Sequence, residues 1–158
     1  MSLIDEYFDY QERFEQKYGE NTIVLMEVGS FFEVYGTDDI GSNKGRIREI
    51  CEVTALTMSK KKGQSKYSKK DYVFMAGFPN HSVEKWKDIL IKNNYVVIII
   101  EQDSHGKKDP KRTITEIVSP GINIDSNHFS NNVMSVYIEC IKDFKSQKPM
   151  VELGLSIA

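Results

Sequence analysis

The sequence has few of the residues that mark a secreted or membrane-embedded chain. Only two cysteines occur among 158 residues, Cys51 and Cys140, and neither has another cysteine at the spacing of a metal-ligand pair. Both are interpreted as buried thiols in a reducing compartment. No stretch approaches the ~20 apolar residues of a membrane-spanning helix, and Asp5 and Glu6 stand where a signal peptide carries basic residues. These absences predict a cytoplasmic protein that does not use a membrane as a partner.

Motifs for nucleotide hydrolysis and for metal binding are missing as well. No Gly-x-x-x-x-Gly-Lys-Ser/Thr segment occurs, so the chain has no P-loop for ATP. His81 and Glu84 lie three residues apart, but no third ligand follows at a suitable spacing. We therefore expect a structural role for His81, and we expect no metal, no cofactor and no catalytic residue in this chain.

What the sequence does contain is apolar material for a core and an uneven distribution of charge. Hydrophobic residues make up 40% of the chain and 17 residues are aromatic, which is typical of a folded domain. Residues 60–71 hold six lysines and one aspartate, a local balance of +5, whereas the whole chain carries −2. The lysines are Lys60, Lys61, Lys62, Lys66, Lys69 and Lys70. They are candidates for contacts with the phosphates of a nucleic acid, and a merely solvated loop is the alternative.

The spacing of apolar residues predicts alternating helices and strands. A helix is expected over residues 2–18, because apolar side chains recur at three- and four-residue steps up to Gly19. Strands are predicted at 22–28, 31–35, 72–76, 95–100 and 113–118, and further helices at about 43–51 and 82–93. Residues 53–58 are expected to be extended, 60–71 to form a loop, and Gly77 with Pro79 to form a turn. This order indicates an α/β fold with a mixed sheet flanked by helices.

The pattern changes after Ser119-Pro120-Gly121, where the first domain is predicted to end. The predicted organisation is a domain over residues 1–121, a linker over 122–132 and part of a second domain over 133–158. The last region has two strand-like runs, and an isolated hairpin is at best marginally stable in water. We therefore expect the chain to be a fragment of a longer protein.

The segment from Gly29 to Gly36 is the most informative part of the sequence. A strand period of two places Phe31, Glu33 and Tyr35 on one face and Phe32 and Val34 on the other. The backbones of Phe31 and Glu33 would lie about 7 Å apart. The aromatic ring could then enter a base stack while the carboxylate accepts a hydrogen bond. From periodicity alone, a core role for Phe31 and a solvated Glu33 is the more common case.

Four segments together resemble the mismatch-recognition domain of the MutS family of DNA repair proteins. They are LMEVGSFFEVYG at 25–36, MAGFPNHS at 75–82, YVVIIIEQ at 95–102 and ITEIVSPG at 114–121, and they occur in the family's order. The resemblance covers roughly residues 7–121, and residues 133–158 are similar to the opening strands of the family's connector domain. Ser30 stands where many members have Asp, Phe32 where many have Tyr, and the lysine-rich segment is longer than usual.

The resemblance implies that Phe31 stacks on a mispaired base from the minor-groove side of a kinked duplex, while Glu33 hydrogen-bonds to that base. Double-stranded DNA with mismatches or small loops would then be the partner, in a nucleoid-associated location. The full-length parent would be a homodimeric ATPase that uses ATP and Mg²⁺. The chain itself would bind and kink DNA without catalysis.

Two other functions remain open at this stage. A metal-dependent nuclease would use Glu101 and Asp103 at the end of a buried strand, with Lys111 as a charged helper. A protein-docking module would use the strands of residues 133–158 to pair with a partner's sheet edge. A second basic group, formed by Lys107, Lys108, Lys111 and Arg112, is a weaker candidate for phosphate contacts.

Overall fold

The computed structural model describes residues 2–37, 44–103, 110–121, 134–142 and 149–157. The contacts within the chain form two compact units, residues 1–122 and 123–158, which are treated separately below. The first unit contains α1 (Leu3–Tyr18), β1 (Thr22–Val28), β2 (Phe31–Gly36), η1 (Lys44–Arg46), α2 (Ile47–Thr54), β3 (Ser59–Lys62), β4 (Tyr72–Pro79), η2 (Asn80–Ser82), α3 (Val83–Lys92), β5 (Val96–Gln102) and β6 (Arg112–Val118).

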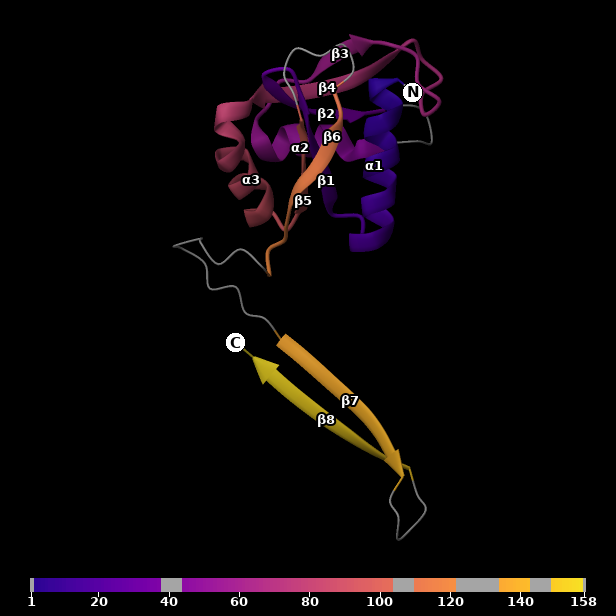
Figure 1. Ribbon diagram of the computed structural model, residues 1–158, viewed down its shortest axis with the longest axis vertical. Coiled ribbons are helices and arrows are strands. Elements are labelled where there is room, and N and C mark those ends of the chain that lie inside the picture. Colours follow the sequence, from indigo (N-terminus) through magenta and orange to yellow (C-terminus); the bar gives the residue numbers. More distant parts are fainter. Residues whose placement is uncertain (1, 38–43, 104–109, 122–133, 143–148, 158) are drawn as a thin grey trace. The chain divides into compact units, whose positions relative to one another are not determined.

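The six strands of the first unit form one mixed sheet in the order β3-β4-β2-β1-β5-β6. The pair β1–β5 is parallel and the other neighbours are antiparallel. Helix α1 covers one face of the sheet, and α2 and α3 cover the other (Figure 1). The predicted α/β class, with a mixed sheet between helices, is confirmed.

Each face of the sheet carries its own hydrophobic core, and the strand residues alternate between the two cores. Phe32 and Val34 of β2 pack on the α2 and α3 side, whereas Tyr35 packs on the α1 side with Tyr7. The rings of Tyr7 and Tyr35 meet edge to face, with centroids 5.0 Å apart. The predicted alternation along β2 is therefore confirmed. Tyr35 is nevertheless buried, because helices cover both faces of the sheet at this point.

Gln11 of α1 is a buried polar residue that continues the sheet's hydrogen bonding. Strand β2 pairs with β1 only from Met26 onward, so the earlier part of β1 needs other partners. The Gln11 side chain donates to the Thr22 carbonyl at 2.6 Å and accepts from the Val24 N–H at 2.9 Å. It thereby satisfies two backbone groups whose burial without a partner would be costly.

The structure differs from the sequence-based prediction in the middle of the first unit. The predicted loop at 60–71 begins with an edge strand, β3, which pairs with β4 from Ser59 to Lys62. Lysines are frequent on edge strands, where they discourage pairing with other chains. Strand β4 continues through the predicted turn at Gly77 and ends at Pro79, and the expected extended segment at 53–58 starts instead inside α2.

The second unit consists of the hairpin β7 (Met134–Lys142) and β8 (Pro149–Ile157). Both predicted strands are confirmed. Its described apolar side chains are largely exposed, namely Val136, Tyr137, Ile138, Leu153 and Leu155. The predicted linker at 122–132 lies outside the described residues, and the assignment of this unit to a connector domain stays a prediction.

Of the two cysteines predicted to be buried, only Cys51 has a described side chain, and its burial is intermediate. Cys51 is partly buried on α2, and burial raises the pKa of its thiol. The side chain of Cys140 lies outside the described part of the chain. Among the helices that the structure describes, none combines the length and the apolar character needed to cross a membrane.

Candidate nucleic-acid interface

Phe31 is presented at the start of β2 by a two-residue turn, Gly29-Ser30, that follows β1. Gly29 has φ 65°, a conformation that suits glycine at the first position of a tight hairpin turn. Phe31 pairs with Val28 and Pro79 at the end of the sheet. Its side chain is 48% exposed, whereas the neighbouring Phe32 is 2% exposed. The structure thus separates two adjacent aromatic residues into a core ring and a surface ring.

Glu33 lies on the same face as Phe31, and two groups in the described part of the chain donate hydrogen bonds to it. Lys61 Nζ lies 2.6 Å from Glu33 Oε2, and the buried Tyr35 hydroxyl donates to the same oxygen. Lys61 Nζ also lies 2.8 Å from the Tyr35 hydroxyl, so the three groups form a closed triangle. Burial, together with the hydrogen bond to Glu33, raises the pKa of Tyr35, which keeps its hydroxyl protonated as a donor.

A pocket of about 440 Å³ opens beside Phe31 and Glu33. Its other lining residues are Thr57, Ser59, Met75, Ala76 and Gly77. Gly77 pairs with Glu33 across β2 and β4, and a Cβ atom at Gly77 would lie 2.8 Å from the Phe32 carbonyl oxygen and 3.4 Å from Glu33 Cγ. The absence of a side chain at Gly77 is therefore needed for the close approach of β4 to the Phe32 carbonyl group of β2.

The lysines of the 60–71 segment are not equivalent. Lys61 is held by Glu33, and Lys66 Nζ lies 2.8 Å from Asp9 Oδ1 of α1. Lys60 and Lys62 are exposed on β3, and Lys60 Nζ lies 4.5 Å from the centroid of the Tyr72 ring. Lys70 also approaches the Tyr72 ring, at 5.6 Å, and Lys69 is exposed.

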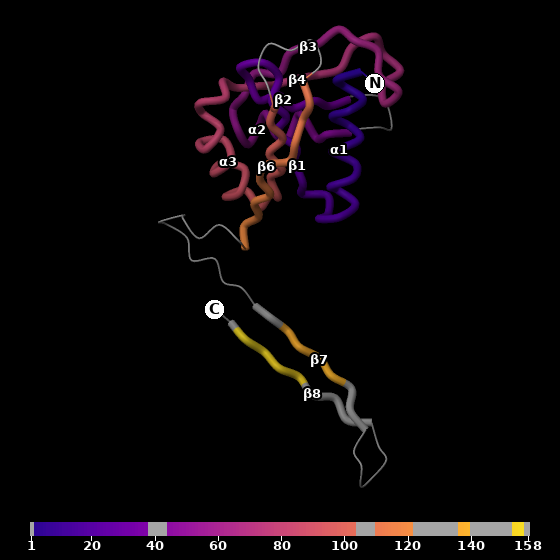
Figure 2. The backbone as a smooth tube through the Cα atoms, in the orientation of Figure 1, coloured from indigo at the N-terminus to yellow at the C-terminus, as the bar shows by residue number. Residues whose placement is uncertain are grey.

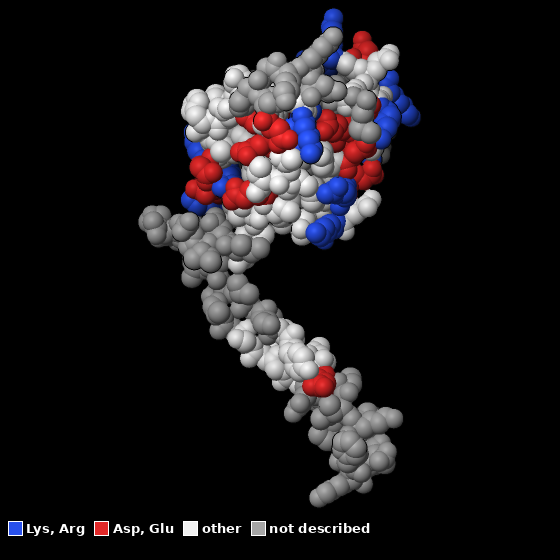
Figure 3. Space-filling model, in the orientation of Figure 1, with Lys and Arg blue, Asp and Glu red and all other residues white. Residues whose placement is uncertain are grey.

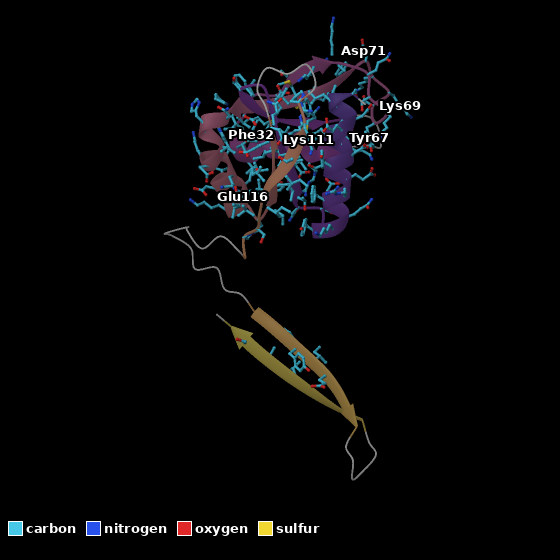
Figure 4. All side chains as sticks on the ribbon, viewed as in Figure 1. Phe32, Tyr67, Lys69, Asp71, Lys111 and Glu116 are labelled. Carbon is cyan, nitrogen blue, oxygen red and sulfur yellow. The ribbon has the colours of Figure 1, made fainter. Side chains whose placement is uncertain are left out.

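On the face shown in Figure 3, basic and acidic side chains lie intermingled over the first unit. Lys69 and Asp71 lie together at the outer edge of the unit (Figure 4). On the face shown in Figure 3, a phosphate backbone would meet lysines interspersed with carboxylates and not a continuous basic surface.

Residues 63–71, which follow β3, are held to the first turns of α1 by hydrogen bonds, and the two segments lie close together in Figure 2. Asp5 accepts hydrogen bonds from the Ser65 hydroxyl at 2.7 Å and the Lys66 N–H at 3.0 Å, while Tyr67 donates to Asp9 at 2.5 Å. Hydrogen bonds from Lys66 and Tyr67 hold the pKa of Asp9 below its usual value, and the bond to Asp9 raises the pKa of Tyr67 to about 12.

The residues of the nuclease hypothesis are placed at the end of β5 and the start of β6. Glu101 and Asp103 are exposed, and Asp103 accepts a hydrogen bond from Thr113 at 3.3 Å. The Asp103 N–H donates to the carbonyl of Lys111 at 2.9 Å, which holds the backbone of Lys111 next to Asp103. Within the described ranges, no group of three or more His, Cys, Asp or Glu side chains is arranged to hold a metal.

Of the other basic and metal-ligand candidates, Arg112 and Glu84 have ion-pair partners of their own. Arg112 Nη1 lies 3.0 Å from Glu6 Oε2 and its side chain is only 8% exposed, so Arg112 is not accessible to phosphates. Lys107 and Lys108 lie outside the described residues. Glu84 pairs with Lys87 at 2.8 Å and not with His81.

Sequence reasoning predicts Phe31 and Glu33 as the site, and this stays a prediction, but it missed the residues that hold Glu33. Lys61 was a predicted phosphate contact, and the structure places it against Glu33, 28 positions away in the sequence. Tyr35 was assigned to the correct face, but its hydroxyl contact with Glu33 was not predicted. The alternation of Glu33 and Tyr35 along β2 was the available signal for that contact, whereas the register of β3 was not visible in the sequence.

The fold and this site define a class of protein. It is an α/β domain with an exposed aromatic ring at the end of its sheet and a partly buried carboxylate beside that ring. Residues 9–127 match the family model described as MutS domain I. The chain belongs to the MutS family, and these residues are its domain I. The resemblance read from the sequence is confirmed.

Individual relatives support the same assignment. The chain is 32% identical over 140 residues to the DNA mismatch repair protein MutS of Parabacteroides distasonis, an alignment that covers 84% of the chain and 14% of the relative. With MutS of Bacteroides thetaiotaomicron it shares 33% identity over 110 residues, 68% of the chain and 11% of the relative. A mutS homolog of Acanthamoeba polyphaga mimivirus is 26% identical over 154 residues, 96% of the chain and 13% of that protein. The chain thus spans about one seventh of these proteins or less.

Proposed function

We propose that this chain recognises mismatched double-stranded DNA in DNA mismatch repair, with Phe31 as a wedge and Glu33 as a hydrogen-bond acceptor for the displaced base. Membership of the MutS family supports the general role. The observation that supports the particular residues is the exposure of the Phe31 ring, 48%, directly beside the Glu33 carboxylate and an open pocket.

A wedge of this kind selects mismatches by deformability. Inserting a ring between base steps costs a few kcal/mol of unstacking, and the cost is smaller where pairing is already poor. Since Phe31 carries no donor or acceptor on its side chain, it contributes no preference for a particular sequence. The expected behaviour is a preference for mismatches and small loops over matched duplex.

Glu33 acts differently from an isolated carboxylate, because Lys61 and Tyr35 already donate to its Oε2 atom. No described residue donates to Oε1, and we assign this oxygen to the base. The lysine also offsets the repulsion between Glu33 and the phosphates of DNA. Glu33 therefore approaches DNA as part of a neutral pair, and the penalty for a matched duplex is smaller than for an unpaired carboxylate.

The phosphate contacts are assigned to the exposed lysines of the 60–71 segment, with Lys60 and Lys62 of β3 as the principal candidates. Lys61 and Lys66 are engaged with Glu33 and Asp9. Each lysine that neutralises a phosphate should reduce the slope of log affinity against log salt by about 1 when it is removed.

The test is a fluorescence anisotropy titration at fixed salt with two duplexes that differ by a single mismatch. The unmodified chain should bind the mismatched duplex more tightly, and Phe31→Ala should remove the difference. Tyr18→Ala is the matched control, since it deletes another exposed ring, 37% exposed, at the end of α1. Equal binding of both duplexes by the unmodified chain, unaffected by Phe31→Ala, would refute the proposal.

The relatives are much longer than this chain, so a second proposal concerns a longer protein of which the chain would be one segment. We infer that this chain works as the non-catalytic recognition segment of a homodimeric ATPase that uses ATP and Mg²⁺. No P-loop motif occurs in residues 1–158, so none of these residues is assigned to ATP. Measuring ATP hydrolysis by the chain alone tests this division, because hydrolysis above background would contradict it.

A further inference from the structure

Glu27 is a buried acidic residue to which the proposed roles of Phe31 and Glu33 assign no function. It lies near the end of β1, two positions before Gly29, and is only 6% exposed. Burying a carboxylate is costly unless donors surround it. The Gln102 N–H donates to Glu27 Oε2 at 3.0 Å, and the Asn80 side-chain amide lies 3.4 Å from Oε1.

The position of Glu27 explains why it takes the Gln102 N–H. The parallel pairing of β1 with β5 ends at Met26 and Ile100, so the backbone beyond this point has no strand partner on that side. The Glu27 carboxylate replaces the missing ladder bond. A charged acceptor also makes a stronger hydrogen bond than a neutral carbonyl.

The two residues that donate to Glu27 also hold the turn in front of Phe31. The Gln102 side chain donates to the Gly29 carbonyl at 3.3 Å, and the Asn80 N–H donates to the Ser30 carbonyl at 3.0 Å. Both residues of the two-residue turn are therefore fixed by groups that converge on one carboxylate. Gln102 ends β5 and Asn80 begins η2, so three separate parts of the chain meet behind the turn.

We propose that Glu27 is a positioning residue for mismatch recognition, which fixes the direction of Phe31 through Asn80 and Gln102. The inference rests on the proposed function and deepens it. A ring that enters a base stack is effective only if its backbone resists displacement, since a yielding turn loses the contact that offsets unstacking. Glu27 contacts no DNA in this arrangement, and its effect passes entirely through Phe31.

The test compares Glu27→Gln with Glu116→Gln in the 158-residue chain. Glu27→Gln keeps the size of the side chain but replaces one acceptor oxygen by an amide donor, which would face either the Asn80 amide or the Gln102 N–H. Glu116 accepts from Lys87 at 2.9 Å between β6 and α3, so its variant removes a carboxylate interaction at a different place. Glu27→Gln should lower the preference for the mismatched duplex by roughly tenfold, as for the loss of one charge-assisted hydrogen bond, and Glu116→Gln should leave it unchanged.

Two further measurements separate positioning from a general structural role. In a Phe31→Ala background, Glu27→Gln should cause no further loss of affinity for the mismatched duplex, because there is no ring left to position. Amide hydrogen exchange should accelerate at Gln102 and Asn80 but not at Ile98 in the middle of β5. Asn80→Ala, which deletes one donor to Glu27 and keeps the N–H to Ser30, should give a smaller loss of the same kind and provides a second variant if Glu27→Gln folds poorly.

The possible results have distinct meanings. If Glu27→Gln retains the mismatch preference, or if it lowers the affinity for the mismatched duplex further in the Phe31→Ala background, Glu27 does not act through Phe31 and the inference is wrong. If Phe31→Ala abolishes the preference while Glu27→Gln changes neither binding nor exchange, the proposed function stands and the inference alone fails. If the unmodified chain shows no mismatch preference, the proposed function fails and the role of Glu27 in recognition fails with it.

Discussion

The Nζ atom of Lys61 lies 2.6 Å from the carboxylate of Glu33, although the two residues come from strands that are separated by β4 in the sheet. Both side chains are shielded, with exposed fractions of 29% for Lys61 and 12% for Glu33. Lys61 is therefore an internal partner of the site, in contrast to its exposed neighbours Lys60 and Lys62.

Replacing Lys61 by Met should destabilise the chain by about 1–2 kcal/mol, between the values for exposed and for buried ion pairs. The reason is that Glu33 keeps its hydrogen bond from Tyr35 but loses its cation. Urea denaturation measures the change, with Lys62→Met as the exposed control. In a Glu33→Gln background the cost of Lys61→Met should largely disappear; an undiminished cost would show that Lys61 stabilises the fold through other contacts.

Gly77→Ala should destabilise the chain by about 1–3 kcal/mol, the usual cost of forcing an extra methyl group into packed structure. The new Cβ atom would meet the Phe32 carbonyl oxygen at 2.8 Å, so the backbones of β2 and β4 must separate at this point. Thermal unfolding reports the stability, and anisotropy with mismatched DNA reports whether a shift of β2 disturbs Phe31 and Glu33. A variant with wild-type stability and binding would contradict the close contact.

Gln11→Ala should cost about 2–4 kcal/mol, because it leaves a buried carbonyl and a buried N–H on β1 without partners. Gln16→Ala is a matched control, since it is the same change on the exposed side of the same helix. Denaturant unfolding of both variants is the measurement. Similar small losses in both would mean that water replaces the Gln11 side chain at Thr22 and Val24.

Acidification should release the segment after β3 from α1. The pKa of Asp9 is lowered from 3.8 by its hydrogen bonds with Lys66 and Tyr67, so the folded state favours the ionised carboxylate. This contribution is fully present well above pH 3.8 and is lost as the pH falls through the lowered pKa. The difference in urea midpoint between the unmodified chain and Asp9→Asn should therefore be largest at neutral pH and should disappear in strong acid. A difference that persists unchanged to low pH would contradict an ionic origin.

Local sequence patterns predicted much of the first unit. Helix α1 and strand β1 were predicted within one residue of their observed limits, because their apolar spacing and the stop at Gly19 are local signals. The pattern failed at β3, where three lysines follow Ser59. Lysine has a low intrinsic preference for strands, and this segment becomes a strand only because β4 offers an unpaired edge.

The sequence by itself determined that Phe31 and Glu33 share a face, since neighbouring side chains of a strand point to opposite sides. The tertiary structure decided what surrounds them. Pairing of β3 with β4 brings Lys61 to Glu33, and the ends of β1, β4 and β5 bring Glu27 to the residues that hold the Gly29-Ser30 turn. These contacts join residues 28 and 75 positions apart, and such pairings depend on strand register and on the packing of helices over both faces, which no local pattern encodes.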